Sequence, residues 1–70
     1  MNLENYKFTT ETNENYIIIK SIIIDDINYG LITNFDNQSE SKFVKIDIIN
    51  GNLIFEEIFD NDIIEQIIKA

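Results

Sequence analysis

Apolar and polar residues alternate over short segments through most of this chain, which is the pattern of β-strands. The first segment, YKFTT at residues 6–10, predicts a short strand with Tyr6 and Phe8 on one face. Residues 1–5 before it are expected to be loose, and ETNEN at residues 11–15 is expected to be a polar break. The chain therefore starts with a short strand followed by a turn.

Residues 16–24, YIIIKSIII, predict a strand covered on both faces. Seven of these nine positions are aromatic or β-branched, a composition that favours strand, and helical spacing would leave them no polar face. Strict alternation puts Tyr16, Ile18, Lys20, Ile22 and Ile24 on one side and Ile17, Ile19, Ser21 and Ile23 on the other. Lys20 and Ser21 interrupt the apolar run far short of the roughly 20 residues that span a bilayer.

A hairpin follows from the next two features. Asp25 and Asp26 supply turn residues, and NYGLITNF at residues 28–35 predicts the returning strand, with Tyr29, Leu31 and Phe35 on one face. DNQSES at residues 36–41 is predicted to be a loop.

Asn50-Gly51 predicts a second hairpin, between residues 42–49 and 52–59, because a type I′ turn needs positive φ at both central positions. The turn places Lys45 opposite Glu56, Ile48 opposite Leu53 and Ile49 opposite Asn52. One face then carries a candidate core of Val44, Ile46, Ile48, Leu53 and Phe55. The other face is amphipathic and carries Phe43, Ile49, Ile54 and Ile58 between Lys45, Asp47 and Glu56.

The last segment, DNDIIEQIIKA, predicts a short helix. Asp60 or Asp62 can cap it, Glu65 and Lys69 lie four residues apart, and the apolar stripe comprises Ile63, Ile64, Ile67 and Ile68. The predicted fold class is α+β: one domain, residues 1–70, with an antiparallel sheet of four to five strands, mostly a meander, and one C-terminal helix packed on it.

The composition indicates how so small a chain can be stable and which classes of partner its charge favours. The 70 residues include seventeen isoleucines and no cysteine or histidine, so a dense core or self-association must replace disulfides and metal sites. The net charge is −8, which disfavours nucleic acid and anionic membranes and favours a basic protein partner. The alternative is that this charge only keeps the protein in solution. Without cysteine or an apolar leader segment, a cytoplasmic location is expected.

Candidate catalytic chemistry is sparse. The usual general base and thiol nucleophile are absent, and two isolated glycines cannot form a phosphate-binding loop. We therefore expect no enzyme and no cofactor. Asp60, Asp62 and Glu65 could offer oxygen ligands to a hard cation, but they lack the spacing of a calcium loop. Helix capping explains these acids better, and no metal site is predicted.

Two sets of residues are candidates for binding a protein partner. The charged set, which could imitate nucleic-acid phosphates, comprises Asp25, Asp26, Asp36, Glu40, Asp47 and Glu56. The apolar set, for a partner or a homodimer, comprises Phe43, Ile49, Ile54 and Ile58. The apolar set could instead form a second core layer. An exposed sheet edge is a further docking option.

Three stretches in this order, YIIIKSI with NYGLI, KFVKIDI before Asn50-Gly51, and FEEIFDNDIIEQII, resemble the uncharacterised YrzB-like family of small acidic proteins from low-GC Gram-positive bacteria. The resemblance covers about residues 15–69 and implies a small acidic intracellular domain, with no activity attached. In composition the chain is also similar to acidic inhibitors from phages and mobile elements, such as anti-CRISPR, anti-restriction and uracil-DNA glycosylase inhibitor proteins.

The function expected from the sequence is that of a non-enzymatic protein-binding module. More narrowly, we expect an inhibitor of anti-CRISPR or DNA-mimic type that blocks a basic nucleic-acid-binding protein. A self-associating structural or housekeeping protein is the alternative.

Overall fold

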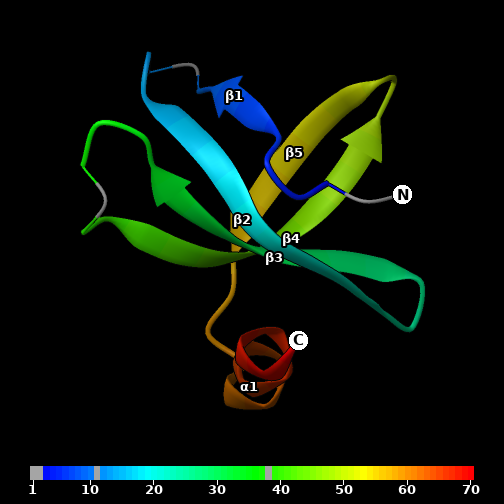
Figure 1. Ribbon diagram of the computed structural model, residues 1–70. Coiled ribbons are helices and arrows are strands. Elements are labelled where there is room, and N and C mark those ends of the chain that lie inside the picture. Colours follow the sequence, from blue (N-terminus) through cyan, green and yellow to red (C-terminus); the bar gives the residue numbers. More distant parts are fainter. Residues whose placement is uncertain (1–2, 11, 38) are drawn as a thin grey trace.

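The computed structural model describes residues 3–10, 12–37 and 39–70, and these form five strands followed by one helix (Figure 1). The elements are β1 (Lys7–Thr9), β2 (Asn15–Ile24), β3 (Ile27–Asn34), β4 (Ser41–Ile49), β5 (Asn52–Glu57) and α1 (Asn61–Lys69). Each strand pairs antiparallel with its neighbour in the chain, in the order β1-β2-β3-β4-β5. The predicted α+β meander with a C-terminal helix is confirmed.

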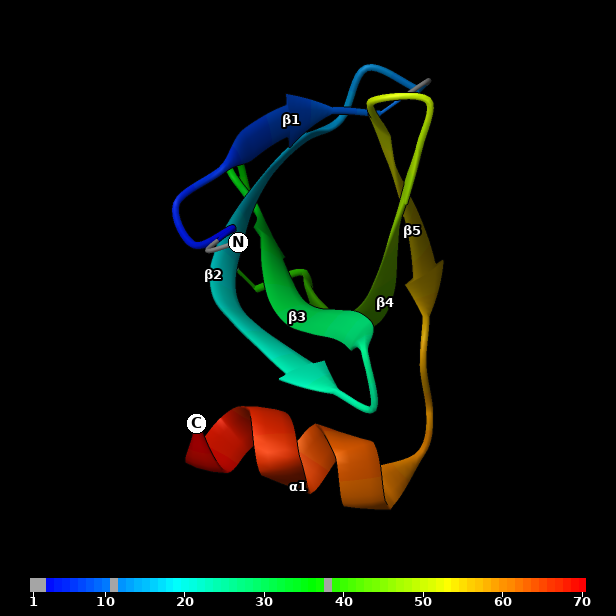
Figure 2. The same ribbon diagram turned by 90° about the vertical axis from the view of Figure 1, so that its right-hand side faces the viewer.

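The sheet curls into a half-barrel, with β1 and β5 at its two edges (Figure 2). This curl gives the sheet a concave face and a convex face. The helix α1 lies outside the curl and packs against β2 and β3. In the described part of the chain, α1 is the one helix, and its length falls well below what crossing a membrane requires.

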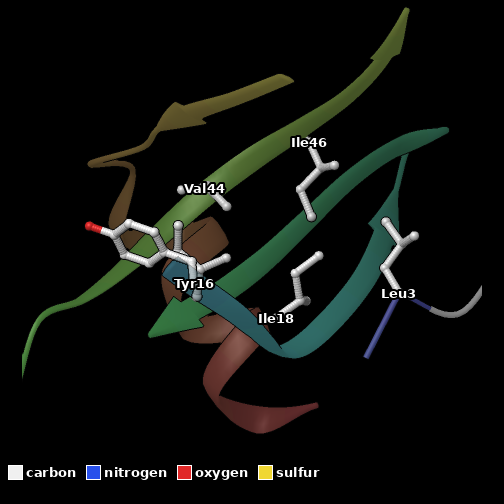
Figure 3. Close-up of a cluster of buried hydrophobic side chains, with 6 residues drawn as sticks. Leu3, Tyr16, Ile18, Val44 and Ile46 are labelled. Atoms are coloured by element: carbon white, nitrogen blue, oxygen red, sulfur yellow. The ribbon is translucent and has the colours of Figure 1, made fainter. Parts of the chain in front are cut away.

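The main core fills the concave face, where side chains from three strands and the N-terminal segment point toward one another (Figure 3). Its buried members are Leu3, Tyr16, Ile18, Ile32, Val44 and Ile46. The expectation of a loose N-terminus is therefore wrong for the described residues 3–5. Leu3 is buried because the curled sheet leaves room for it beside Ile18, and the Asn5 amide donates to the Ile18 carbonyl at 2.7 Å. Met1 and Asn2 lie outside the described residues.

A register shift in β2 overturns the predicted division of its faces. Ile18 pairs with Ile32 and Lys20 pairs with Leu31, so the strand gains one residue between them. Tyr16 and Ile18 therefore point to the concave face, whereas Lys20, Ile22 and Ile24 point to the convex face. Strict alternation had placed all five on one side.

Gly30 pairs with Ser21, next to this irregularity, on the concave face of β3. A Cβ at Gly30 would come within 2.7 Å of the Lys20 carbonyl oxygen and 3.1 Å of the Ile46 Cδ1 atom. Glycine therefore lets β2 cross β3 closely.

Both predicted two-residue turns are present. Asp25 and Asp26 connect the paired residues Ile24 and Ile27 with φ values of 52° and 64°, and Asn50 and Gly51 have φ values of 52° and 81°. The register predicted from Asn50-Gly51 is confirmed at all three positions. Its strand was predicted to reach residue 59, but β5 ends at Glu57, and the Phe59 side chain is 78% exposed.

The helix is held at both ends. The Asp60 carboxylate accepts from the amides of Asp62 and Ile63, at 2.9 and 3.4 Å, so Asp60 is the cap. At the other end, the Lys20 ammonium donates to the carbonyl oxygens of Ile68 and Ala70, at 3.0 and 3.3 Å. Ile67 is fully buried, which anchors α1 on the convex face of β2 and β3.

Candidate functional site

The amphipathic face predicted for the second hairpin lies on the convex side of β4 and β5. The register brings Phe43, Lys45, Asp47 and Ile49 of β4 to the same face as Ile54 and Glu56 of β5. The Ile58 amide donates to the Phe43 carbonyl at 2.9 Å, which adds Ile58 to this face. We call these seven residues the convex patch.

Exposure within the convex patch varies. Phe43 and Ile58 are half-buried, while Ile49 and Ile54 are 51% and 45% exposed. The helix covers β2 and β3 rather than this hairpin. Half of the apolar set thus contributes to packing, and the other half offers apolar surface beside Asp47 and Glu56.

The six candidate acids fall into three places. Asp25 and Asp26 form the turn between β2 and β3, whereas Asp36 and Glu40 lie in the connection between β3 and β4, at the other end of these strands (Figure 1). Asp47 and Glu56 lie on the convex patch, and Asp47 is level with the Asp25–Asp26 end of β3, because Ile46 pairs with Asn28. Asp47 pairs with Ile54, so Glu56 is its diagonal neighbour, roughly 7–8 Å away. On the convex face the fold therefore provides one diagonal acidic pair, not one long row of acids.

Asn34 gives part of the β3–β4 connection a structural role that the sequence reasoning missed. Asn34 is 7% exposed, and its side-chain oxygen Oδ1 accepts from the backbone amides of Asp36 and Asn37 at 2.9 and 3.0 Å. Its side-chain nitrogen Nδ2 donates to the Glu40 carboxylate at 3.3 Å. The signal was present, since asparagine commonly bonds to backbone two residues ahead of it. Glu40 thus helps to hold this loop. Gln38, within the predicted loop, lies outside the described residues.

A groove on the concave face was also missed. It has a volume of ≈ 580 Å³ and lies between β1 with its following turn and β5. Its floor includes Ile32 and Val44, and its sides include Phe8, Tyr16 and Phe55. The predicted core residues Val44, Leu53 and Phe55 line it, whereas Ile48, predicted to join them, is 45% exposed near the hairpin end.

The acids near the helix act on the helix itself. Asp60 caps it, Asp62 lies in the first turn, and Glu65 pairs with Lys69 at 2.7 Å. Throughout residues 3–10, 12–37 and 39–70, no three acidic side chains converge as metal ligands would. Capping is confirmed for Asp60 by its two hydrogen bonds with helix amides.

Comparison of the chain with protein-family models, with curated proteins and with solved structures gave no match.

Proposed function

We propose that this chain is a protein-binding module for a basic partner and that the convex patch is its binding surface. The observation that carries the proposal is the combination of exposed apolar and acidic side chains on one hairpin face: Ile49 and Ile54 beside Asp47 and Glu56. Apolar side chains supply burial and acidic ones supply steering and register. The net charge of −8 favours a cationic partner over a neutral or anionic one.

The narrower form of the proposal is an inhibitor of anti-CRISPR or DNA-mimic type. A basic nucleic-acid-binding protein presents cations arranged to meet phosphates, and a rigid sheet can hold carboxylates at comparable intervals. The diagonal pair Asp47 and Glu56 is the smallest unit of such a surface. Origin from a phage or mobile element agrees with the small acidic chain and remains part of the proposal.

Charge reversal on the convex patch tests this function. Affinity capture from a lysate of an AT-rich Gram-positive bacterium, washed at rising salt, is expected to retain one basic nucleic-acid-binding protein. Asp47→Lys and Glu56→Lys should each release this protein at lower salt and flatten the salt dependence of binding, because each removes an attractive charge.

Asp36→Lys is the matched control, since it makes the same charge change in the β3–β4 connection, away from the convex patch. If all three variants lose the captured protein at the same salt concentration, the effect comes from overall charge and not from the convex patch. Unchanged capture by the Asp47 and Glu56 variants would remove the convex patch as the site.

The second candidate is self-association through the same patch, favoured by the exposure of Ile49 and Ile54. In that case the parent should be a dimer by light scattering, and Ile54→Glu should make it monomeric by burying a charge in the interface. Ile23→Glu is the control, because Ile23 is 57% exposed but lies on β2. A monomeric parent excludes the dimer, and a dimer that survives Ile54→Glu excludes this interface.

A further inference from the structure

The outer edge of β5 presents backbone groups on the side away from β4. The Ile58 amide donates to the Phe43 carbonyl at 2.9 Å, which sets the alternation along this antiparallel pair. Residues at even positions of β5 thus bond to β4, while the N–H and C=O groups of Leu53, Phe55 and Glu57 point outward. In the sheet formed by the described residues, β5 is a terminal strand. These three outward-pointing residues, at alternate positions of β5, are enough to pair with an added strand.

The same three residues also line the concave groove with their side chains. Beside them, the rings of Phe8 and Phe55 stack with centroids 4.1 Å apart, and Phe8 stacks on Tyr16 at 5.7 Å. These stacked rings hold the short strand β1 near β5. One surface therefore combines an open strand edge with a preformed aromatic wall. Figure 2 shows β1 and β5 as the two edges of the curled sheet.

The charges that line the groove favour a cation. Glu14 is held in place by two hydroxyls: Thr12 donates to one of its carboxylate oxygens at 2.9 Å and Tyr16 to the other at 3.4 Å. Glu57 is a second carboxylate along the groove. The cation among the lining residues, Lys42, already lies over the Tyr16 ring, with its ammonium 5.9 Å from the ring centroid. Aromatic faces beside carboxylates attract ammonium and guanidinium groups.

We propose that the β5 edge and the concave groove bind an extended basic segment of a partner protein by strand addition. Alternate side chains of that segment enter the groove, apolar ones against Phe55 and basic ones toward Glu14 and Glu57. A second copy of this chain is a poor occupant of this groove, because an acidic segment would meet the groove carboxylates Glu14 and Glu57. The inference rests on the proposed function for the basic character of the partner, but it concerns a different surface and a different binding mode.

A designed peptide tests the inference directly. The probe is a capped heptapeptide, Thr-Lys-Thr-Val-Thr-Lys-Thr, whose lysines and valine share one strand face, and its control replaces both lysines with glutamate. Titration into ¹⁵N-labelled protein should shift the amides of Leu53, Phe55 and Glu57 and slow their hydrogen exchange. The glutamate peptide should bind much more weakly. Equal binding of both peptides, or shifts that avoid β5, would overturn the proposal.

Adjacent glutamates on opposite faces of β5 provide matched variants. Glu57→Gln should weaken binding of the lysine peptide about two- to fivefold, as expected for an exposed ion pair, whereas Glu56→Gln should leave it unchanged. An equal effect of both variants would mean that the peptide senses only net charge, which contradicts the proposal.

The two proposals fail separately. If the peptide does not bind but capture of the basic protein still depends on Asp47 and Glu56, strand addition is wrong and the convex patch stands. If the peptide binds at β5 while capture ignores Asp47 and Glu56, the convex patch is wrong and the strand-addition site stands.

Discussion

Gly30 shows how one missing side chain shapes the sheet. Its position on the concave face, against the Lys20 carbonyl oxygen and the Ile46 side chain, allows β2 and β3 to approach closely where β2 carries its extra residue. The close approach helps to curl the sheet, and the curl creates the concave core and the groove.

Gly30→Ala is therefore expected to lower the free energy of unfolding by about 1–3 kcal/mol, the usual cost of overpacking. Urea denaturation followed by circular dichroism measures it. Adding Ile46→Val removes the Cδ1 atom that lies 3.1 Å from the new Cβ, but it does not remove the Lys20 carbonyl oxygen at 2.7 Å. The double variant should therefore not recover the lost stability. Full restoration would mean that side-chain crowding, rather than backbone approach, is the cause.

For single residues, the sequence predicts the two-residue turns better than it predicts the extra residue within a strand. Asn50-Gly51 specifies its turn because both positions need positive φ, and Asp25-Asp26 adopts the same geometry. The extra residue in β2 could not be predicted from YIIIKSIII, because nearly every position is isoleucine and either division of the faces looks apolar. Gly30 was the available signal, since a glycine inside a strand often marks such a site.

The helix depends on contacts that its own sequence and β2 supply together. Nine residues are too few for a stable isolated helix. Asp60 satisfies two amides at its start, Lys20 satisfies two carbonyls at its end, and Ile67 anchors its middle. The helix cap and the apolar stripe could be predicted from residue spacing. The hydrogen bonds from Lys20 to the end of the helix could not, because their acceptors lie 48 and 50 residues away in the chain.

Asp60→Ala should lower the free energy of unfolding by about 0.5–2 kcal/mol through loss of the cap. Asp60→Asn should retain most of the stability, because its side-chain oxygen still accepts from the same amides. Thermal and urea denaturation of both variants provide the comparison. If Asn proves as damaging as Ala, the carboxylate charge rather than the capping bond is what matters.

The whole molecule carries thirteen carboxylates against five lysines, and most of them are exposed. Like-charge repulsion should therefore weaken the folded state at low ionic strength. Raising sodium chloride from 10 to 150 mM should increase the free energy of unfolding by on the order of 1 kcal/mol, since the screening length falls from about 30 to about 8 Å. Urea titrations at both salt concentrations test this. Asp36→Lys changes the net charge from −8 to −6 and so weakens the repulsion. It should show a smaller increase in the free energy of unfolding, and a larger increase would contradict the argument.

Of the two proposed binding surfaces, the sequence predicted the residues of the convex patch but not the concave groove. The register from Asn50-Gly51 predicted which residues share the convex patch, because side chains alternate along a strand. It could not show that α1 would pack over β2 and β3 instead and leave Ile49 and Ile54 exposed. The groove depends on the curl, which brings Phe8 and Phe55 together although they lie in the first and last strands.

The extra residue in β2 also has a consequence for how this protein can change by mutation. Deleting Ile19 would remove the extra residue and leave Ile18 opposite Ile32 and Lys20 opposite Leu31, so every later side chain of β2 would keep its face. Lys20 would stay on the convex face at the end of α1, and the deletion would remove only the local bend and twist that the extra residue adds to the sheet. Elsewhere in β2 a one-residue deletion would turn every later side chain to the opposite face, so lineages of this protein should vary in length at the exposed connections and, within β2, only at this position.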